Sequence, residues 1–545
     1  EILSGLVGSE MCIRDRIFAA LFIGLAMTAC SNDDEMTTGG QDQSPVTGGT
    51  AYMSVSLNMP KSTGGTRASG TNHGSTAEQT VGTVLLALFD ASDICVQART
   101  LLPGEYQVTV GSTAGTAGSA FQVPATTKKA LAVINPSADF QNRCVVSAGW
   151  AAINAALTTS VTDVIGTAED NFMMINAGDA TTHKALIDVT GNIKTVGGAI
   201  ADATAAKAAA AASPAAINVE RVVAKVSLQE KTGGAEVTAP GATCTFGDWA
   251  LNVTNKDMFP FSEIVTPIGS MIANYRKDNN YAAGSFNVSK FNYLALDATT
   301  GALPADFTTM GVDKYCLENT MDATEQKMAQ TTSAVVSAVY TPAGYTADKS
   351  WFRLLGTSYE TLADLKAVYA AAAAAGSPSP LQTQQKNLCN EFYVRIAAMA
   401  TAQGATWNAS DFSSLDIDEM DDIVNGGEAS KPAVIPANPP TVPAATVQDL
   451  GVEYFQKGTC YYSILIRHDD AVTGTMELGK YGVVRNNWYT LTINTVKQPG
   501  TPWIPDPTNP IVPTDPGDDN DEAESFLAVG ITVNPWITWS QGVDL

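Results

Sequence analysis

Apolar and polar positions alternate in two segments near opposite ends of the 545-residue chain. The apolar side chains are Met53, Val55, Leu57 and Met59 in the first segment, and Leu527, Val529, Ile531 and Val533 in the second. Because successive side chains of a strand point to opposite faces, each segment is predicted to be a β-strand with one apolar face. The two strands therefore present equivalent faces. Coincidence is the plain alternative, since many β-strands alternate in this way.

The second strand follows a segment, residues 499–525, that is rich in proline and carboxylates. Proline donates no backbone hydrogen bond and neighbouring acids repel one another, so an extended, unpacked tether is predicted. A strand at the end of such a tether is poorly placed to pair within its own domain. We therefore expect this strand to be offered to another molecule.

Short apolar runs with strand character recur through the body of the chain. They are Val84–Phe89, Lys129–Ile134, Arg221–Leu228, Trp249–Thr254, Ser333–Tyr340, Tyr461–Arg467 and Trp488–Val496. Many short strands between Gly, Pro and Asn turns favour a mainly β fold built of β-sandwiches. Helices are expected over Ala203–Ala212, Tyr359–Ala374 and Leu388–Ala400. The first two should be surface insertions, because alanine supports a helix but adds little core.

An apolar run, residues 17–27, lies near the N-terminus. It is too short to span a bilayer and has the length of a signal-peptide core. It leads into Met27-Thr28-Ala29-Cys30, which resembles a bacterial lipobox whose cysteine is acylated. The alternative is an ordinary secretory signal with an incidental cysteine. Residues 1–16 are predicted to be non-native and are set aside from the fold prediction.

A Gly-, Ser- and Thr-rich segment, residues 61–76, comes after the first strand. It has almost no apolar side chains, so an exposed loop that proteases reach easily is expected. Within it, the bond between Arg67 and Ala68 is a well-presented site for an arginine-specific protease.

The composition disfavours nucleic acid as a partner and zinc as a ligand. The formal net charge is −24, which argues against nucleic acid as a partner because phosphates would be repelled. Two cysteines lie in the leader, and the other six are scattered without a CxxC pair or a neighbouring histidine, which disfavours zinc. These six are Cys95, Cys144, Cys244, Cys316, Cys389 and Cys460. Buried free thiols and one or two long-range disulfides both remain open.

Catalytic motifs are weak. His73, His183 and His468 lie far apart without a nucleophile or metal partner, which favours surface or core roles. Gly474–Lys480 has the spacing of a phosphate-binding loop, but a tyrosine replaces the magnesium-binding Ser or Thr. Because strands flank this segment, a hairpin turn is the better interpretation. We expect no enzymatic activity and no cofactor.

A cluster of four aspartates is a candidate calcium-binding site. Its members are Asp416, Asp418, Asp421 and Asp422. Their spacing is not that of an EF-hand, and the glycine and closing glutamate are missing, so a solvated acidic loop is preferred.

Segments in order along nearly the whole chain resemble the fimbrillin family of Bacteroidales type V pili, closest to the Mfa-type minor-fimbrium shaft subunits. Besides the lipobox, they are Tyr52–Pro60, Lys129–Asn135, Asn218–Lys225, Trp249–Lys256, Tyr315–Thr320, Gly482–Tyr489 and Ile531–Trp536. Each segment alone is weak. The alanine-rich insertions and the segment 405–447 depart from the family pattern.

The resemblance implies a surface-fimbria subunit that supports adhesion and biofilm formation. It implies export to the outer membrane as a lipoprotein, removal of the first strand by cleavage after Arg67, and head-to-tail polymerisation by strand donation into an extracellular fimbrium. Copies of the chain, accessory anchor and tip subunits, membrane lipid and an arginine-specific protease would then be its partners.

The resemblance also implies two transthyretin-like β-sandwich domains. The expected organisation is a leader (1–30), a propeptide with the first strand (31–67), two sandwiches (68–260 and 261–498), and a tether with the donor strand (499–545). An anchor or tip subunit is the nearest alternative. A glycan-binding lipoprotein would need a platform of exposed aromatics, and Trp351, Trp407 and Trp503 are too dispersed to identify one. A secreted hydrolase is disfavoured by the lack of a catalytic constellation.

Overall fold

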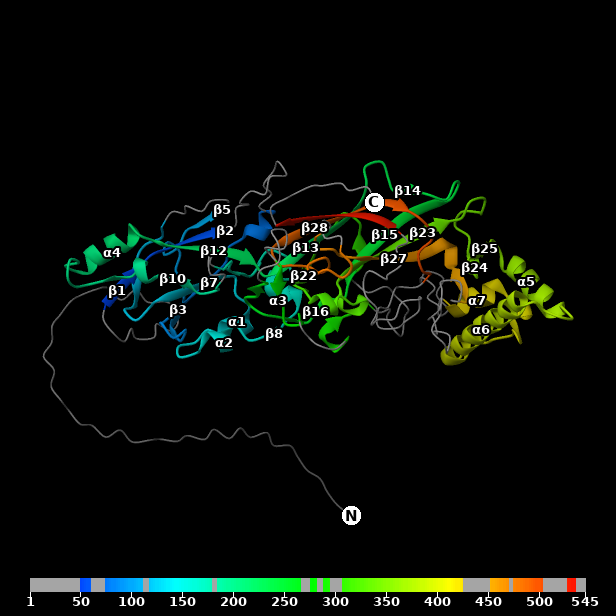
Figure 1. The fold of residues 1–545 in the computed structure, drawn as a ribbon, viewed down its shortest axis with the longest axis horizontal. Helices are drawn as coiled ribbons and strands as arrows, with labels where there is room; N and C mark the ends of the chain where they lie inside the picture. Colours follow the sequence, from blue (N-terminus) through cyan, green and yellow to red (C-terminus); the bar gives the residue numbers. More distant parts are fainter. Residues whose placement is uncertain are drawn as a thin grey trace, which may run out of the picture. The chain divides into compact units, whose positions relative to one another are not determined.

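The structure is a computed structural model of the chain, and it describes residues 50–59, 74–110, 117–178, 184–265, 275–281, 288–294, 306–424, 451–469, 474–502 and 527–535. All of these residues belong to one compact unit, residues 44–545. Strands dominate, so the predicted mainly β class is confirmed (Figure 1). No helix among these residues is both long and apolar enough to cross a membrane.

The first core is built on an eight-stranded sheet. Its path runs β4-β3-β7-β9-β12-β2-β5, and β10 also pairs with β7. The strands are β2 (Val55–Met59), β3 (Val84–Phe89), β4 (Cys95–Thr100), β5 (Val108–Val110), β7 (Lys129–Ile134), β9 (Met174–Asn176), β10 (Ile187–Asp188) and β12 (Ala215–Arg221). A second sheet, β11-β1-β6, contains β1 (Thr50–Met53), β6 (Phe121–Pro124) and β11 (Lys194–Thr195).

Helices and short strands complete this first core. The helices are α1 (Ala138–Arg143), α2 (Trp150–Ile153), α3 (Val161–Ile165) and α4 (Ala203–Ala211). Strand β8 (Leu157–Thr158) pairs with β17 (Asp257–Met258), and Met258 and Phe261 are buried in the first core.

The second core lies between two sheets. One has the order β29-β28-β13-β22, with β14 also pairing β28; the other has the order β21-β15-β23-β27. The first sheet comprises β13 (Val223–Glu230), β14 (Glu236–Val237), β22 (Lys314–Leu317), β28 (Asn487–Val496) and β29 (Leu527–Pro535). The second comprises β15 (Thr243–Asn252), β21 (Thr308–Thr309), β23 (Ser333–Thr341) and β27 (Thr459–Leu465). Alternate side chains of both sheets share one apolar cluster, which is the packing of a β-sandwich.

A third apolar cluster joins helices to a small sheet, β25-β24-β26. Its strands are β24 (Trp351–Leu354), β25 (Thr357–Tyr359) and β26 (Val452–Phe455), and its helices are α5 (Leu362–Ala374), α6 (Pro380–Gln403) and α7 (Ile417–Val424). Short pairs complete the described strands: β16 (Thr254–Asn255) with β20 (Phe291–Asn292), and β18 (Glu263–Ile264) with β19 (Arg276–Lys277).

The two β cores meet where the chain passes from β12 into β13. Val223 belongs to the first cluster and Ala224 to the second. This passage precedes the boundary predicted near residue 260, because β17 and Phe261 return to the first core. The count and limits of the domains stay a prediction.

One local prediction is wrong. The acids at 416–422 are not a loop but belong to α7 and its start, where the Asp416 carboxylate accepts from the backbone N–H groups of Asp418 and Glu419. Met420 and Ile423, three positions apart, bury one face of this helix. The alanine-rich helices α4 and α5 each bury two or three side chains and otherwise lie at the surface, and their being insertions stays a prediction.

Candidate functional site

The first strand lies between other strands over most of its length. Strand β1 pairs antiparallel with β6 on one edge and β11 on the other. Strand β2 pairs parallel with β12 on one edge and β5 on the other. We call the backbone edges of these four strands, together with α4, the first-strand slot. Residues 50–59 fill it.

Both faces of the first strand are buried. Met53, Val55 and Leu57 are fully inaccessible and Met59 is 3% exposed, so the predicted apolar face is confirmed as core. The opposite face is buried too. Tyr52, Ser54, Ser56 and Asn58 are at most 7% exposed. The alternation of the sequence suggested one apolar face and gave no indication that the polar face would also be covered.

Helix α4 covers the start of the slot (Figure 1). Ala206 and Ala210, which are both inaccessible, pack against the ring of Tyr52, and the Lys207 ammonium lies 5.5 Å from the ring centroid. The hydroxyl of Ser54 donates to the carbonyl of Ala210 at 2.7 Å. Helix α4 therefore leaves room for an aromatic ring at position 52, and it leaves only a small space at position 54.

Three strands depend on the first strand for their pairing. Among the described residues, β5 pairs only with β2, and β6 and β11 pair only with β1. Strand β12 keeps β9 as a second partner. Without residues 50–59, β5, β6 and β11 would lose the ladders that fix them, leaving buried backbone groups that need new partners.

The chain beyond the protease-prone segment is held by a buried charge cluster. The Glu78 carboxylate accepts from the Lys225 ammonium at 2.8 Å and from the Tyr315 hydroxyl at 2.6 Å. The Arg221 guanidinium donates twice to the Glu78 carbonyl, at 2.9 and 3.1 Å. We call Glu78, Arg221, Lys225 and Tyr315 the Glu78 anchor. It fixes residue 78 where the two β cores meet, and residues 60–73, which link it to the first strand, lie outside the described residues.

The terminal strand pairs within its own chain. Strand β29 lies antiparallel to β28, with Leu491 opposite Ile531, and it forms the edge of the second sandwich (Figure 1). Ile531 is 7% exposed and belongs to the second core. The expectation that this strand would not pair within its own domain is therefore wrong. In an isolated copy of the chain, β29 covers the free edge of β28, because an uncovered edge leaves backbone groups and apolar side chains in water.

Three predicted site residues lie outside the described residues. These are the lipidation candidate Cys30 and the two residues of the cleavage site, Arg67 and Ala68. Their roles stay predictions. Of the predicted donor positions Leu527, Val529, Ile531 and Val533, the structure places all four on β29 and gives side-chain burial for Ile531.

The buried cysteines and the buried histidine are held in their neutral forms. The six cysteines named above are free, and burial raises the pKa of the Cys316 thiol to about 12. His468 is a core residue, whose Nδ1 lies 2.8 Å from the Tyr489 hydroxyl, and burial lowers its pKa to about 4. His73 and His183 lie outside the described residues. Within the described ranges, no group of His, Cys, Asp and Glu is placed to hold a metal.

The phosphate-loop-like segment is a turn. Its flanks pair through an antiparallel bridge between Arg467 and Tyr481, and the Lys480 ammonium donates back to the Gly474 carbonyl at 3.3 Å. Lys480 thus closes its own loop, and the predicted turn is confirmed.

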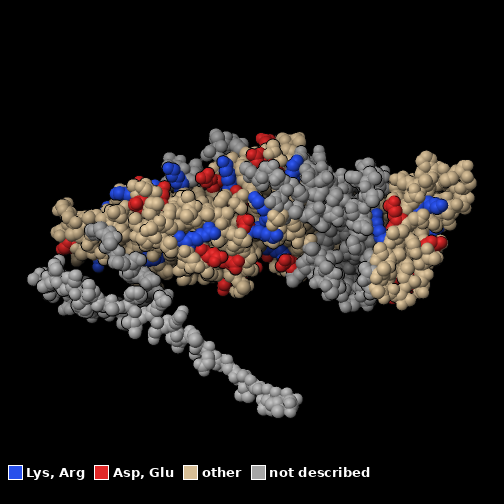
Figure 2. Space-filling model, turned by 90° about the horizontal axis from the view of Figure 1, so that it is seen from below, with Lys and Arg blue, Asp and Glu red and all other residues tan. Residues whose placement is uncertain are grey.

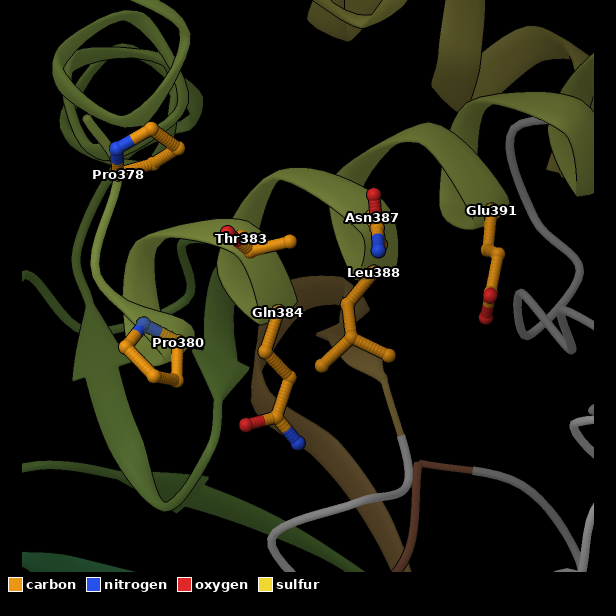
Figure 3. Close-up of a pocket in the computed structure, with 7 residues that line it drawn as sticks. All are labelled: Pro378, Pro380, Thr383, Gln384, Asn387, Leu388 and Glu391. Atoms are coloured by element: carbon orange, nitrogen blue, oxygen red, sulfur yellow. The ribbon is translucent and has the colours of Figure 1, made fainter. Parts of the chain in front are cut away.

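A hollow of about 570 Å³ lies along the first turns of α6 (Figure 3). Its wall is formed by Pro378, Pro380, Thr383, Gln384, Asn387, Leu388 and Glu391. Gln384 and Leu388 project from the same side of the helix, and Glu391 lies one turn further on. With a single carboxylate and no nucleophile beside it, the hollow offers no catalytic arrangement.

The surface gives little sign of a sugar or nucleic-acid platform. Lys and Arg side chains are interspersed with Asp and Glu on the face seen in Figure 2, and no single basic patch stands out there. Trp351 is buried, Trp407 is half-buried, and Trp503 lies outside the described residues. Neither of the two described tryptophans, Trp351 and Trp407, therefore offers the fully exposed ring that a glycan-binding platform would need.

Comparison with known families identifies the class of protein. Residues 453–542, which include β27, β28 and β29, match the family model described as major fimbrial subunit protein type IV, fimbrillin, C-terminal. This match over the C-terminal part of the chain agrees with the predicted resemblance to the fimbrillin family. The closer resemblance to Mfa-type shaft subunits stays a prediction. A search of curated protein sequences gives no match.

Solved structures with similar folds include three from Bacteroidales. A fimbrillin, FimA, from Porphyromonas gingivalis W83 is 14% identical, with 90% of this chain and 98% of that chain covered and a TM-score of 0.37. The tip fimbrial protein Mfa3 from Porphyromonas gingivalis is 12% identical, with 85% and 96% covered and a TM-score of 0.30. A putative cell adhesion protein from Parabacteroides distasonis ATCC 8503 is 12% identical, with 89% and 97% covered and a TM-score of 0.40.

Proposed function

We propose that this chain is a structural subunit of a cell-surface fimbria, which is activated by cleavage after Arg67 and polymerises when the terminal strand of one copy enters the first-strand slot of the next. One observation carries the proposal: residues 50–59 lie between strands on both edges, are buried on both faces, and are succeeded by a protease-prone segment. A strand so placed blocks the slot until it is removed.

Cleavage would free the first strand without unfolding the chain beyond residue 78. The Glu78 anchor holds that part of the chain, so the freed segment would end before it. Loss of residues 50–59 would expose the surroundings of Met53, Val55, Leu57 and Met59 and would unpair β5, β6 and β11. Burying four apolar side chains contributes roughly 1.5–3 kcal/mol each, which strongly favours refilling the slot.

The terminal strand suits the role of the incoming strand. It has the same apolar alternation, and it lies at the edge of its own sheet, paired on one side only. In this proposal its place on β28 is a resting position from which it is exchanged into the neighbouring subunit by β-strand addition. Because donor and acceptor are different surfaces, the contact is head-to-tail and extends into a filament.

Before cleavage, acylation of Cys30 would hold the precursor at the outer membrane through its buried lipid chains. The same cleavage after Arg67 that opens the slot would also separate the subunit from its lipid anchor. Adhesion, and contacts with anchor and tip subunits, would then be properties of the assembled fimbrium.

The test compares three forms of the protein in cells that assemble filaments. Wild type should give filaments whose subunits begin at Ala68. Arg67→Ala should keep the precursor intact and give none. Filaments of intact Arg67→Ala subunits would contradict activation by cleavage. A chain truncated before Phe526 that still polymerises after cleavage would contradict donation by the terminal strand.

Labelling with a palmitate analogue tests the anchor. Cys30→Ala should abolish labelling and surface display, with the buried Cys389→Ala as the matched cysteine control. Normal display of the Cys30→Ala form would contradict the lipoprotein proposal.

A further inference from the structure

We propose that the first-strand slot accepts residues 526–533 of a second copy in one direction and one register only, with Phe526 in the place of Tyr52 and Ala528 in the place of Ser54. This inference rests on the proposed function and makes it specific. It adds direction, register and two selecting positions that the apolar alternation alone does not define.

In this register, with the chain running in the same direction, the four apolar positions stay apolar, and the other four keep an aromatic ring, two small residues and one polar residue. The replacements are Tyr52 by Phe526, Met53 by Leu527, Ser54 by Ala528, Val55 by Val529, Ser56 by Gly530, Leu57 by Ile531, Asn58 by Thr532 and Met59 by Val533. Each of the eight resident side chains is at most 7% exposed, so a replacement has to fit on both faces of the strand.

Helix α4 excludes a shift of the register by one residue. The Ser54 hydroxyl lies 2.7 Å from the Ala210 carbonyl, so the space at this position ends at the backbone of the helix. Ala528 fits there. A slip of one residue would place Leu527 or Val529 against that backbone and would turn the apolar face away from the core. The slot therefore tolerates a small residue at this position and excludes a branched one.

The pocket of Tyr52 selects the direction. A terminal strand running the opposite way would also keep the apolar alternation, with Thr532 in the place of Ser54, but it would bring Asn534 into the pocket. That pocket is lined by Ala206 and Ala210 and faces the Lys207 ammonium. An aromatic ring restores both the apolar packing and the cation–ring attraction, whereas a buried amide would need hydrogen-bond partners.

Cross-linking between processed subunits tests direction and register together. Asn218 on β12 is exposed and lies opposite Asn58, so a cysteine there reports which donor residue takes that position. Subunits carrying Asn218→Cys are mixed with subunits carrying Thr532→Cys, Ile531→Cys or Ala528→Cys and treated with a short thiol cross-linker. The native cysteines of the described part are poor competitors, because burial raises the pKa values of all six thiols to about 11 or 12.

The expected product joins residue 218 to residue 532. A product with residue 528 instead would establish the opposite direction, and one with residue 531 would establish a slipped register; either would overturn this inference while leaving the proposed function intact. If the chain truncated before Phe526 forms the same filaments, the proposed function itself fails.

Side-chain size at position 528 gives a second, independent test. Ala528→Leu should slow filament growth by about tenfold or more, because the larger side chain meets α4. The control Ala528→Ser restores the hydroxyl that Ser54 carries and should assemble like wild type. Equal growth of the Leu and Ser variants would overturn the role of α4.

Discussion

At the scale of single residues, the buried charges matter most at the Glu78 anchor. The Glu78 side chain is 1% exposed and that of Lys225 is 6% exposed, so their ion pair is removed from water. Lys225 also pairs with Asp313 at 2.7 Å, so part of its charge would stay compensated if Glu78 lost its own. The anchor ties the segment after the predicted cleavage site to β13 through buried, charged hydrogen bonds.

We predict that Glu78→Gln lowers the free energy of unfolding by about 1.5–3 kcal/mol, because it weakens the charged hydrogen bonds to Lys225 and Tyr315. Urea denaturation of the precursor measures this change. The control is the exposed pair of Lys231 and Glu236, separated by 3.7 Å, where Lys231→Ala should change stability by at most about 0.5 kcal/mol. Equal effects of the two substitutions would show that the anchor is no stronger than a surface contact.

His468 gives the protein a pH dependence of known sign. Burial lowers its pKa in the folded protein to about 4, against an ordinary value of 6.5. The unfolded chain therefore binds the proton first as the pH falls, and the contribution of neutral His468 is complete above about pH 6.5 and is lost progressively down to about pH 4. Glu220 and Asp278 act in the opposite sense, since burial raises the pKa of each carboxyl to about 7.

The prediction for His468 is a difference between two proteins. As the pH is lowered from 6.5 to 4, the free energy of unfolding of wild type should fall by about 1.4 kcal/mol per pH unit relative to that of His468→Gln. Both proteins retain Glu220 and Asp278, so the contributions of these carboxyls cancel in the comparison. Urea denaturation at several pH values gives the slope, and a difference that does not change with pH would contradict a buried neutral histidine.

At the scale of elements, the proposed function makes the first strand part of the fold of the precursor and not of that of the processed subunit. We predict that Leu57→Ala lowers the stability of the precursor by about 2–5 kcal/mol, because it removes buried volume. The same substitution should have no effect after cleavage and release of the strand. The control is Leu131→Ala in β7, which should destabilise both forms, since Leu131 stays in the core. Thermal unfolding before and after protease treatment separates the cases.

The terminal strand should be the element of the second sandwich that opens most easily. It is an edge strand, paired with β28 alone. We predict that amide hydrogens of β29 exchange faster than those of β13, which lies between β28 and β22, and that Ile531→Ala accelerates exchange in β29 without altering the first core. Protection of β29 equal to that of β13 would contradict a strand that is available for exchange.

The sequence predicted some of these elements well and others poorly, for physical reasons. Val84–Phe89 and Lys129–Ile134 were predicted with the bounds of β3 and β7, because continuous apolar runs in a buried sheet mark their own limits. Helix α7 was not predicted, because acids occupy half of its positions and the spacing of Met420 and Ile423 is a weak helical signal by itself. The slot was predicted only on its apolar face. Ser54 is covered by α4, which lies 156 residues further along the chain at Ala210. The alternation of side chains along a strand cannot predict such a distant contact.

At the scale of the whole molecule, the same sequence has to serve two arrangements. In the precursor, the first strand fills the slot and the terminal strand covers its own β28 edge. In the proposed filament, the first strand would be gone and the terminal strand would belong to the neighbour. The exchange would be favoured because the emptied slot would leave three strands without ladders, whereas the donor would leave a single sheet edge behind.

One measurement tests this account most directly: electron microscopy of purified precursor before and after treatment with an arginine-specific protease, with wild type and the chain truncated before Phe526 side by side. The account predicts monomers in both untreated samples, filaments from treated wild type whose subunits begin at Ala68, and monomers from the treated truncated chain. Filaments from the untreated precursor, or from the treated chain without its terminal strand, would contradict it.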